Sequence, residues 1–356
     1  MKHYFVENPV SGKNNTLDII NELIVPAAER AGIDYEIYST KERGDGLRFV
    51  REKCEQANGE PVRFYAVGGD GTLYEVVNGA ADYPNAQVTV IPKGSGNDYI
   101  RLYGDREQFL NIDNLINGIP LQVDAVEIDD GSGWKEYAIN QASMGFDAET
   151  TVKQSAMKKV PGAIGHVTYL LAGLYCMFTK VYNDFRCIVD GKEIEGPFVF
   201  AVGASSRWYG SGIPVAPFAD PTDGKLDFVI YRRLTFWPAL FKVGLIDWQK
   251  KGTHIFKPYV EYIRGEKMEL IPKKSTWIQV DGECRQVEHC TFSVAPGKLT
   301  FVVPKDSTYF ERNKNGELSY KIDQGWRHRE PHKTIQNKLS LFDLLVNKGL
   351  MKVVRK

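Results

Sequence analysis

The chain has 356 residues, of which 43% are hydrophobic and 25% charged, a composition typical of a globular protein long enough for two domains. Lysine plus arginine and aspartate plus glutamate number 45 each, so no overall charge would recruit nucleic acid or an anionic membrane. Five cysteines without close CxxC spacing argue against a disulfide framework or a zinc site and favour reduced thiols in the cytoplasm.

The first strand is predicted at Tyr4–Val6, and the N-terminus enters it directly, without the apolar core of a signal peptide. The strand ends in the polar loop Glu7–Lys13. Apolar residues then recur at helical spacing over Leu17–Ala27, although Pro26 should break or kink that helix. A second strand is predicted at Tyr35–Tyr38.

Two further predicted strands end in glycine-rich loops. Val62–Val67 precedes Gly68–Thr72, the sequence GGDGT, and Leu73–Val77 then reads as the opening of a helix. Val88–Ile91 precedes Pro92–Asp98, the sequence PKGSGND. Glycines allow close approach to a ligand, and free amides at a helix N-terminus attract phosphate. Because loops after parallel strands lie at one sheet edge, three such loops predict a phosphate site, whereas GGDGT alone could be a plain tight turn.

The pattern changes near Val123. Alternating strands and helices up to this point predict a doubly wound parallel sheet, and short strands punctuated by turns beyond it predict an antiparallel β-rich domain. The later strands are expected at Arg186–Val189, Phe198–Val202, Leu226–Tyr231, Trp277–Val280 and Thr291–Ala295. Asp-Gly at 190 and 281 favours hairpins, and Pro296-Gly297 is expected to end a strand. Apolar helices at 167–181 and 236–248 should pack on the sheet, and the first, the longest apolar stretch, is too short to span a bilayer.

These changes predict a nucleotide-binding domain over residues 1–122, completed by about 304–330, and a β-rich domain over 123–303. Residues 331–356 form an amphipathic basic segment. Such a segment can lie in a membrane interface, or it can cover the protein's own domain or a dimer partner, which is slightly favoured.

The ordered motifs NPVSGK, GGDGTLYEVVNG and IPKGSGNDYIR resemble the diacylglycerol kinase catalytic family, specifically the soluble bacterial lipid kinases. The later runs DPTDGKLD at 220–227 and VDGE at 280–283 also resemble that family. The resemblance extends from about residue 3 to about residue 305. It implies an α/β nucleotide domain plus a β-rich domain, with the active site in the cleft between them.

The resemblance also implies a binding site for ATP. Backbone amides of the GGDGT loop would hold the phosphates, with a hydrogen bond from the Thr72 hydroxyl and a point charge from Lys13. Glu75 would lie at the edge of the nucleotide. The implied nucleotide-binding residues are Asn8, Ser11, Gly12, Lys13, Thr40, Gly68, Gly69, Asp70, Gly71, Thr72, Glu75 and Ser95.

Carboxylates suit Mg²⁺, which prefers hard oxygen ligands. Asp70 and Asp98 fit a catalytic Mg²⁺ network, and Asp124 is a weaker candidate; the alternative for each is a helix cap or a turn residue. By resemblance, Asp220, Asp223 and the Lys225 carbonyl would form a structural Mg²⁺ site, the alternative being a solvated loop.

Asp281 is the general base that the resemblance implies, placed to deprotonate a lipid hydroxyl as it attacks the γ-phosphate. The residues alone favour an ordinary hairpin turn, because Asp-Gly lies between two strand-like runs. Glu283, two positions on, would share a strand face with Asp281 and could orient it or raise its basicity.

The expected activity is ATP- and Mg²⁺-dependent phosphorylation of a lipid hydroxyl, with diacylglycerol as the favoured acceptor and phosphatidic acid as product. The enzyme would be cytoplasmic, would touch the membrane transiently and could form a homodimer. Candidate groove residues, for which ordinary core is the alternative, are Met144, Phe146, Val167–Phe178, Trp208 and Tyr209.

Tyr74 stands where asparagine is frequent in the bacterial family, and Ser95 stands where threonine is frequent. The serine keeps the hydroxyl, whereas the bulkier Tyr74 could alter the nucleotide edge. Two alternatives to a lipid kinase remain, an NAD kinase and a non-catalytic lipid-binding protein of the same fold. The NPVSGK and GSGND runs argue against the first, and intact Asp70, Asp98 and Asp281 argue against the second.

Overall fold

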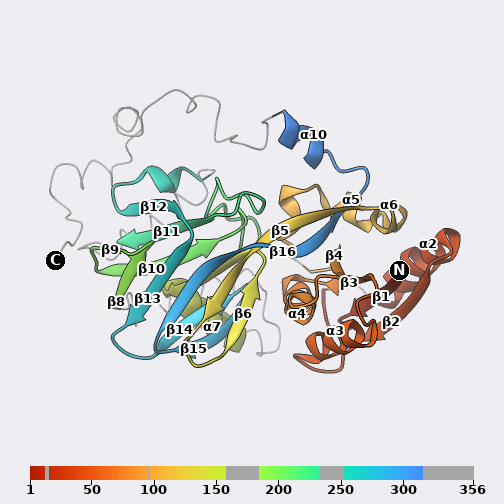
Figure 1. Cartoon of the computed structure of the whole chain (residues 1–356), viewed down its shortest axis with the longest axis horizontal. Coiled ribbons are helices and arrows are strands. Elements are labelled where there is room, and N and C mark those ends of the chain that lie inside the picture. The colour runs from red at the N-terminus through yellow and green to blue at the C-terminus, as the bar shows by residue number, and fades with distance from the viewer. Residues whose placement is uncertain (13–15, 95, 158–183, 233–251, 316–356) are drawn as a thin grey trace.

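The computed structural model describes residues 1–12, 16–94, 96–157, 184–232 and 252–315, and the statements below concern these residues. They form two lobes side by side, one with the N-terminal strands and helices and one built mainly of strands (Figure 1). The helices predicted at 167–181 and 236–248, and the basic segment 331–356, lie outside the described residues.

The first lobe is built on four parallel strands, as predicted. They are β1 (Lys2–Glu7), β2 (Asp34–Ser39), β3 (Val62–Gly68) and β4 (Ala86–Pro92), in the order β2-β1-β3-β4. The register sets Glu7 beside Val67, and Gly68 beside Pro92. The strands therefore end level with one another, which brings the loops that follow them to one edge of the sheet.

Helices connect these strands. They are α1 (Thr16–Ile19), the π-helix η1 (Ile20–Ile24), α2 (Val25–Ala31), α3 (Asp45–Gln56), α4 (Asp70–Ala80), the 3₁₀ helix η2 (Tyr99–Leu102), α5 (Arg106–Leu110) and α6 (Ile112–Ile116). The expected break at Pro26 is absent: the chain winds from η1 straight into α2, and Pro26 lies in the first turn of α2, where a missing N–H is tolerated.

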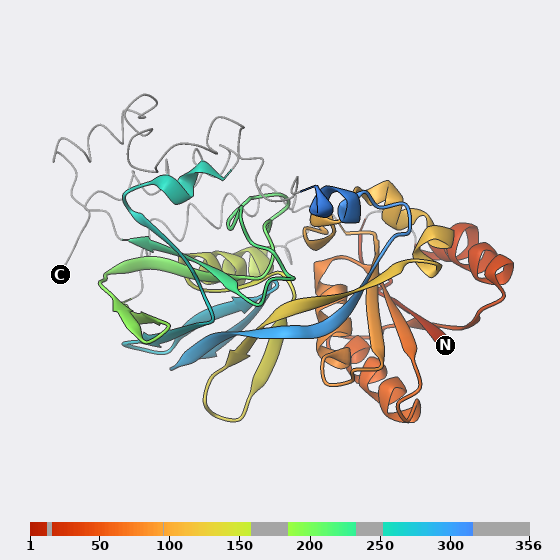
Figure 2. The same ribbon diagram turned by 45° about the horizontal axis from the view of Figure 1, so that its top comes forward.

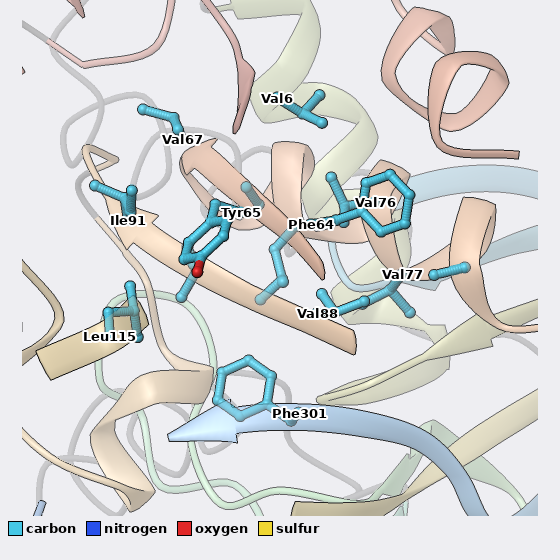
Figure 3. Packing of buried hydrophobic residues seen from close by; sticks show 14 of the residues in the cluster. Val6, Phe64, Tyr65, Val67, Val76, Val77, Val88, Ile91, Leu115 and Phe301 are labelled. Carbon is cyan, nitrogen blue, oxygen red and sulfur yellow. The ribbon is translucent and has the colours of Figure 1, made fainter. Parts of the chain in front are cut away.

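The core of this lobe lies between the sheet and its helices. Phe64 and Tyr65 of β3 are fully buried beside Val76 of α4 and Leu115 of α6 (Figure 3). Phe301 enters the same cluster from near the end of the described chain. Burying each such side chain stabilises the fold by about 1.5–3 kcal/mol. The core therefore holds the strands, and the loops that follow them, in place.

Two long antiparallel strands join the lobes. They are β5 (Ile119–Asp129) and β16 (Cys290–Val303), and β16 also pairs in parallel with β4 (Figure 2). The strand end predicted at Pro296-Gly297 is wrong, because β16 runs through it with a bulge between Ala295 and Leu299. The domain boundary expected at 122–123 falls inside β5, so both lobes share this strand.

The second lobe extends this sheet with β6 (Lys135–Ala138), β8 (Phe185–Val189), β9 (Lys192–Ile194) and β13 (Lys267–Pro272). Its second sheet is antiparallel, as predicted, with the order β12-β11-β10-β7-β14-β15. The strands are β7 (Gln141–Gly145), β10 (Phe198–Ala204), β11 (Leu226–Arg232), β12 (Val260–Gly265), β14 (Thr276–Val280) and β15 (Glu283–Val287). Three helices complete the described fold: α7 (Phe146–Met157), η4 (Thr253–Phe256) and α10 (Tyr309–Lys314).

Both predicted Asp-Gly hairpins are present in this lobe. Asp190 has φ +47° and Gly191 +78° between β8 and β9, while Asp281 has φ +46° and Gly282 +96° between β14 and β15. Left-handed angles at both central residues are those of the tight turn that Asp-Gly favours. Of the described residues, no helix is long and apolar enough to cross a membrane, and the four described cysteines are free thiols.

Candidate active site

The loops after β1, β3 and β4 pack directly against one another. The N–H groups of Lys93 and Gly94 donate to the Gly68 carbonyl at 2.7 and 3.1 Å. A Cβ on Gly94 would lie 2.6 Å from the Gly69 Cα, and a Cβ on Gly12 would lie 2.5 Å from the Lys93 carbonyl oxygen. Only glycine permits such approaches, so the structure brings the three predicted loops together through backbone contact.

Asp70 links two of these loops at the start of α4. Its carboxylate accepts from the N–H groups of Asn97 at 2.9 Å and Asp98 at 3.0 Å. Burial, and then the charge of Asp98, raise the pKa of Asp70. A Cβ on Gly96 would come within 2.4 Å of the Asp70 Oδ2. Position 96 must therefore be glycine for the Asp70 carboxylate to keep its place.

Asp98 connects the two lobes. Its side chain is buried, and its Oδ1 accepts from the Arg101 Nε at 2.9 Å. Its Oδ2 accepts from the Ser211 N–H at 2.8 Å, and Ser211 lies in the loop after β10 of the second lobe. The two carboxylates predicted to hold a metal are thus adjacent, and one of them also contacts the other lobe.

Asp281 lies at the tip of the β14–β15 hairpin. Its carboxylate accepts from the N–H groups of Ile139 at 2.8 Å, Asn140 at 3.2 Å and Gln141 at 2.8 Å. Burial raises the pKa of Asp281 to about 7 against the lowering effect of these bonds, and the charge of Asp70 raises it further. Asp281 is therefore both a turn residue and a half-buried carboxyl whose charge interacts with the first lobe.

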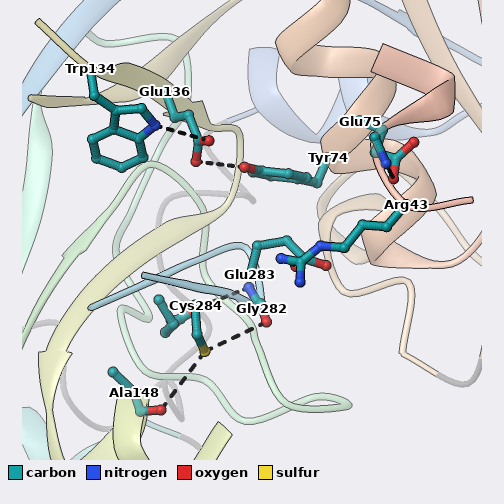
Figure 4. A network of polar contacts seen from close by, with 11 residues as sticks. Arg43, Tyr74, Glu75, Trp134, Glu136, Ala148, Gly282, Glu283 and Cys284 are labelled. Atoms are coloured by element: carbon teal, nitrogen blue, oxygen red, sulfur yellow. Dashed lines mark hydrogen bonds and ion pairs between the residues drawn. The ribbon is translucent and has the colours of Figure 1, made fainter. Parts of the chain in front are cut away.

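The remaining acids near this hairpin form a polar network between α4 and the second lobe (Figure 4). Glu283 pairs with Arg43, and burial raises its pKa. Tyr74 of α4 donates to Glu136 at 2.5 Å, and Glu136 also accepts from the Trp134 indole at 3.2 Å. The expectation that Glu283 shares a strand face with Asp281 is wrong, because the left-handed turn at 281–282 interrupts strand alternation.

Several expected nucleotide residues are engaged in local structure. Both carboxylate oxygens of Glu75 accept from the first turn of α3, from Gly44 at 2.7 Å and Gly46 at 2.9 Å. The Asn8 side chain accepts from the Val10 N–H at 3.1 Å, within its own loop.

Two hydroxyl-bearing residues of the expected nucleotide set, Thr40 and Thr72, follow β2 and β3 in the chain. The Thr40 N–H donates to the Glu7 carbonyl at 2.8 Å where β2 ends. The Thr72 Oγ1 is buried against Gly68 and has no hydrogen-bond partner among the described residues. Lys13 and Ser95 lie outside the described residues.

Asp124 ties separate segments together. Its carboxylate accepts from the N–H groups of Gly224 and Gly297, both at 2.7 Å, and its own N–H donates to the Pro221 carbonyl at 2.6 Å. The Gly297 bond lies at the bulge in β16 and explains why the chain does not turn there. A helix-cap or turn role was the alternative for Asp124, and the observed role is this cross-strand tie.

The predicted second metal loop forms local turns. Asp220 accepts from the Thr222 N–H at 3.0 Å, and Asp223 accepts from the Lys225 N–H at 3.0 Å and pairs with Arg264. The Lys225 ammonium pairs with Glu266. Within the described ranges no group of three or more His, Cys, Asp or Glu side chains is arranged to hold a metal ion. The Mg²⁺ sites therefore stay predictions.

The candidate groove residues are split by the structure. Met144 is fully buried in the core of the second lobe, Tyr209 is buried, and Phe146 and Trp208 are half-buried. For Met144 the ordinary-core alternative therefore holds. Positions 167–178 lie outside the described residues.

Sequence reasoning missed Asn140 and Ser211, because both hold a site carboxylate through backbone N–H groups. Backbone donation leaves no residue-type signal in a sequence. The Arg101 contact to Asp98 had a signal, since the two residues are three positions apart at the start of a helical turn.

Comparison with family models gives two matches. The diacylglycerol kinase catalytic domain matches residues 2–128, and the YegS C-terminal NAD kinase beta sandwich-like domain matches residues 140–303. Together they define a two-domain kinase that phosphorylates an alcohol acceptor. Residues 2–128 thus match the diacylglycerol kinase catalytic family, as the ordered motifs indicate.

Individual relatives agree with this assignment. The chain is 28% identical over 309 residues to a diacylglycerol kinase from Staphylococcus carnosus (strain TM300), covering 85% of this chain and 94% of that one. It is 28% identical over 304 residues to a probable lipid kinase YegS-like from Enterobacter sp. (strain 638), covering 83% and 95%. A putative diacylglycerol kinase structure from Bacillus anthracis str. Sterne has the same fold, with a TM-score of 0.63 at 20% identity over 85% of this chain and 96% of that one.

Proposed function

We propose that this protein transfers the γ-phosphate of ATP to the hydroxyl of a membrane lipid, with diacylglycerol as the favoured acceptor and phosphatidic acid as the product. Relatives across most of the chain carry the names diacylglycerol kinase and lipid kinase. Because diacylglycerol resides in a bilayer, the enzyme would act in the cytoplasm through transient contact with a membrane surface, alone or as a homodimer.

One observation carries the proposal. The carboxylates of the GGDGT and GSGND loops meet at Asp70 and Asp98, and Asp98 accepts a hydrogen bond from Ser211 of the lobe that carries Asp281. Burial, and in addition the negative charge of Asp70, raise the pKa of Asp281. Phosphoryl transfer needs this combination, in which phosphate-binding loops, paired carboxylates and a proton acceptor come together from two lobes.

The residues fit a nucleotide phosphate with a divalent cation. Asp70 and Asp98 supply hard carboxylate oxygens, and burial together with the charge of Asp98 raises the pKa of Asp70, an effect a cation would relieve. The first turn of α4 and the glycine loop beside it would provide N–H groups for the phosphates. Bound Mg²⁺ would neutralise charge on the phosphate oxygens, and Asp70 and Asp98 would hold it.

Asp281 would act as the general base. Three backbone N–H groups hold its carboxylate, that of Asn140 reaching both oxygens, and they would fix the orientation in which the carboxylate meets the acceptor hydroxyl. A pKa of about 7 makes Asp281 a stronger base than an ordinary aspartate. Asp281 would take the hydroxyl proton as the bond from the lipid oxygen to the γ-phosphorus forms and ADP leaves.

Transfer of labelled phosphate from ATP to a panel of lipids in mixed micelles, with NAD as an additional acceptor, tests the proposal. The panel contains diacylglycerol, phosphatidylglycerol and a sphingoid base. Asp281→Asn removes the base, and Asp190→Asn is its matched control. Asp190 is also the first residue of an Asp-Gly hairpin turn, and its carboxylate accepts from two backbone N–H groups, but it is exposed in the second lobe.

We expect transfer to diacylglycerol, a loss of about a hundredfold or more in Asp281→Asn, and near wild-type transfer in Asp190→Asn. Transfer to NAD alone would overturn the lipid acceptor. ATP binding without transfer to any acceptor would identify a non-catalytic lipid-binding protein. Equal losses in the two variants would show that Asp281 matters only as a turn residue.

A further inference from the structure

Asn140 lies between the Asp281 carboxylate and the segment that follows β10. Its own N–H donates to Asp281 at 3.2 Å, beside those of Ile139 and Gln141. Its carbonyl accepts from the N–H groups of Ser205 and Ser206, at 3.0 and 3.1 Å. One residue thus contacts the candidate base on one side and a second chain segment on the other.

The Asn140 side chain holds the same segment farther along. Its Nδ2 donates to the Trp208 carbonyl at 2.6 Å, while its Oδ1 is buried without a partner among the described residues. The residue is 9% exposed, so loss of the donor would leave the Trp208 carbonyl unpaired in a largely dry environment. Asn140 therefore fixes residues 205–208 at both ends.

The segment then reaches the first lobe. Ser211 has φ +71°, between Gly210 at +57° and Gly212 at +103°, and its N–H donates to the Asp98 Oδ2 at 2.8 Å. A non-glycine residue in the left-handed region persists where its surroundings hold it. The Asp98 N–H donates in turn to Asp70 at 3.0 Å. Hydrogen bonds thus link Asp281 through Asn140 to residues 205–208, the chain itself continues to Ser211, and hydrogen bonds then link Ser211 through Asp98 to Asp70.

We infer that Asn140 is a positioning residue that sets the Asp281 hairpin in register with Asp98 and Asp70 by anchoring residues 205–211. The effect on catalysis rests on the proposed function. The structural effect, that a change at Asn140 weakens the contact between Ser211 and Asp98, rests on the hydrogen bonds alone. The role differs from substrate binding because the Asn140 side chain contacts the protein and not the reacting atoms.

The test compares Asn140→Leu with Asn78→Leu. Asn78 of α4 is also a buried asparagine between the lobes: its Nδ2 donates to the Tyr137 carbonyl at 2.9 Å, and its Oδ1 accepts from the Tyr137 N–H at 2.8 Å. Its contact is with Tyr137 of β6, two residues before Ile139, and not with residues 205–211. Both variants should lower the melting temperature, so a difference between them reports on position and not on the loss of a buried amide.

Amide hydrogen exchange in peptides covering 205–211 and 97–102 measures whether a change at Asn140 loosens these two segments, and it needs no enzyme assay. We expect exchange in Asn140→Leu to rise by about tenfold in both peptides, and to stay at the wild-type rate in Asn78→Leu. In the lipid kinase assay, kcat should fall by about tenfold to a hundredfold in Asn140→Leu, with the KM for ATP within about threefold of wild type.

Unchanged exchange at 97–102 in Asn140→Leu would overturn the inference, as would a raised KM for ATP with unchanged kcat. Equal falls in kcat in both variants would assign Asn140 a merely structural role. If the wild-type protein phosphorylates no acceptor, the proposed function fails, and the exchange result alone decides whether Asn140 couples the two lobes.

Discussion

Two aspartates show what separates a turn residue from a candidate base. Asp190 and Asp281 are each followed by a glycine and have nearly the same φ, and the carboxylate of each accepts hydrogen bonds from backbone N–H groups. The hairpin at each was predictable from Asp-Gly between strand-like runs. The difference in their exposure was not, because it depends on segments more than a hundred positions away: Ile139, Asn140 and Gln141 donate to Asp281, which is half-buried, whereas Asp190 is exposed.

Burial of Asp281 predicts how the enzyme responds to pH. The protonated carboxyl cannot accept a proton, so transfer should fall as pH drops through about 7, the pKa of Asp281, and level off above it. The observable is kcat/KM for ATP between about pH 5.5 and 9, which reports the free enzyme and should fall by about tenfold per pH unit on the acid side.

Asp190→Asn should keep the same profile, and binding of a non-hydrolysable ATP analogue serves as the control for loss of the nucleotide at low pH. A rate that stays level down to about pH 5.5 would mean that the group accepting the proton has an ordinary carboxyl pKa, and Asp281 would lose its assignment.

At the scale of elements, hydrophobic periodicity and glycine loops were sufficient to predict β1, β3, β4 and the start of α4. Two predictions failed, the first for a local reason and the second for a long-range one. The π-helix before α2 lets the chain wind past Pro26, and the Asp124 carboxylate holds the Gly297 N–H within the β16 bulge. A local sequence pattern identifies a position where the chain can turn, but a hydrogen bond from a residue far away in the sequence can keep the chain extended there.

The contact between α4 and β6 explains the unusual Tyr74. Its ring packs in the core of the second lobe and its hydroxyl donates to Glu136, so this residue of the first lobe holds the two lobes together. Tyr74→Phe should lower the free energy of unfolding by about 1 kcal/mol, because Glu136 loses one of the two donors that it has among the described residues and keeps the Trp134 indole. Affinity for an ATP analogue should stay at the wild-type level.

Urea denaturation measures this change, and Tyr83→Phe is the matched control. The Tyr83 hydroxyl donates to Glu55 at 3.0 Å on the surface, so its removal should cost less than about 0.5 kcal/mol. Equal costs in the two variants would show that the Tyr74–Glu136 bond gives no more than a surface contact.

The whole molecule shares one backbone framework between its two lobes. The ten-stranded sheet carries the four parallel strands of the first lobe at one end and β13, β8 and β9 at the other, and β16 lies between them. The fold classes of the two lobes could be predicted from the change of pattern near Val123, but it could not be predicted that one sheet runs through both lobes. A sequence shows where alternation stops, whereas pairing of β16 with β4 joins segments some two hundred positions apart.

The shared strand predicts that the lobes unfold together. Phe301 and Phe292 are both fully buried on β16, the first in the core of the first lobe and the second in that of the second lobe. Each change to alanine should cost about 3–5 kcal/mol. Because unfolding either core removes one end of the same strand, either variant should destabilise both lobes equally.

Hydrogen exchange at increasing urea, read in peptides from β3 and β10, separates the lobes, since these strands belong to different sheets. Cooperative unfolding shifts both midpoints together in each variant. If Phe301→Ala shifted only β3 and Phe292→Ala only β10, the lobes would be independent units. The relative position of Asp70 and Asp281 would then depend on contacts such as Ser211 to Asp98, not on the continuous strand.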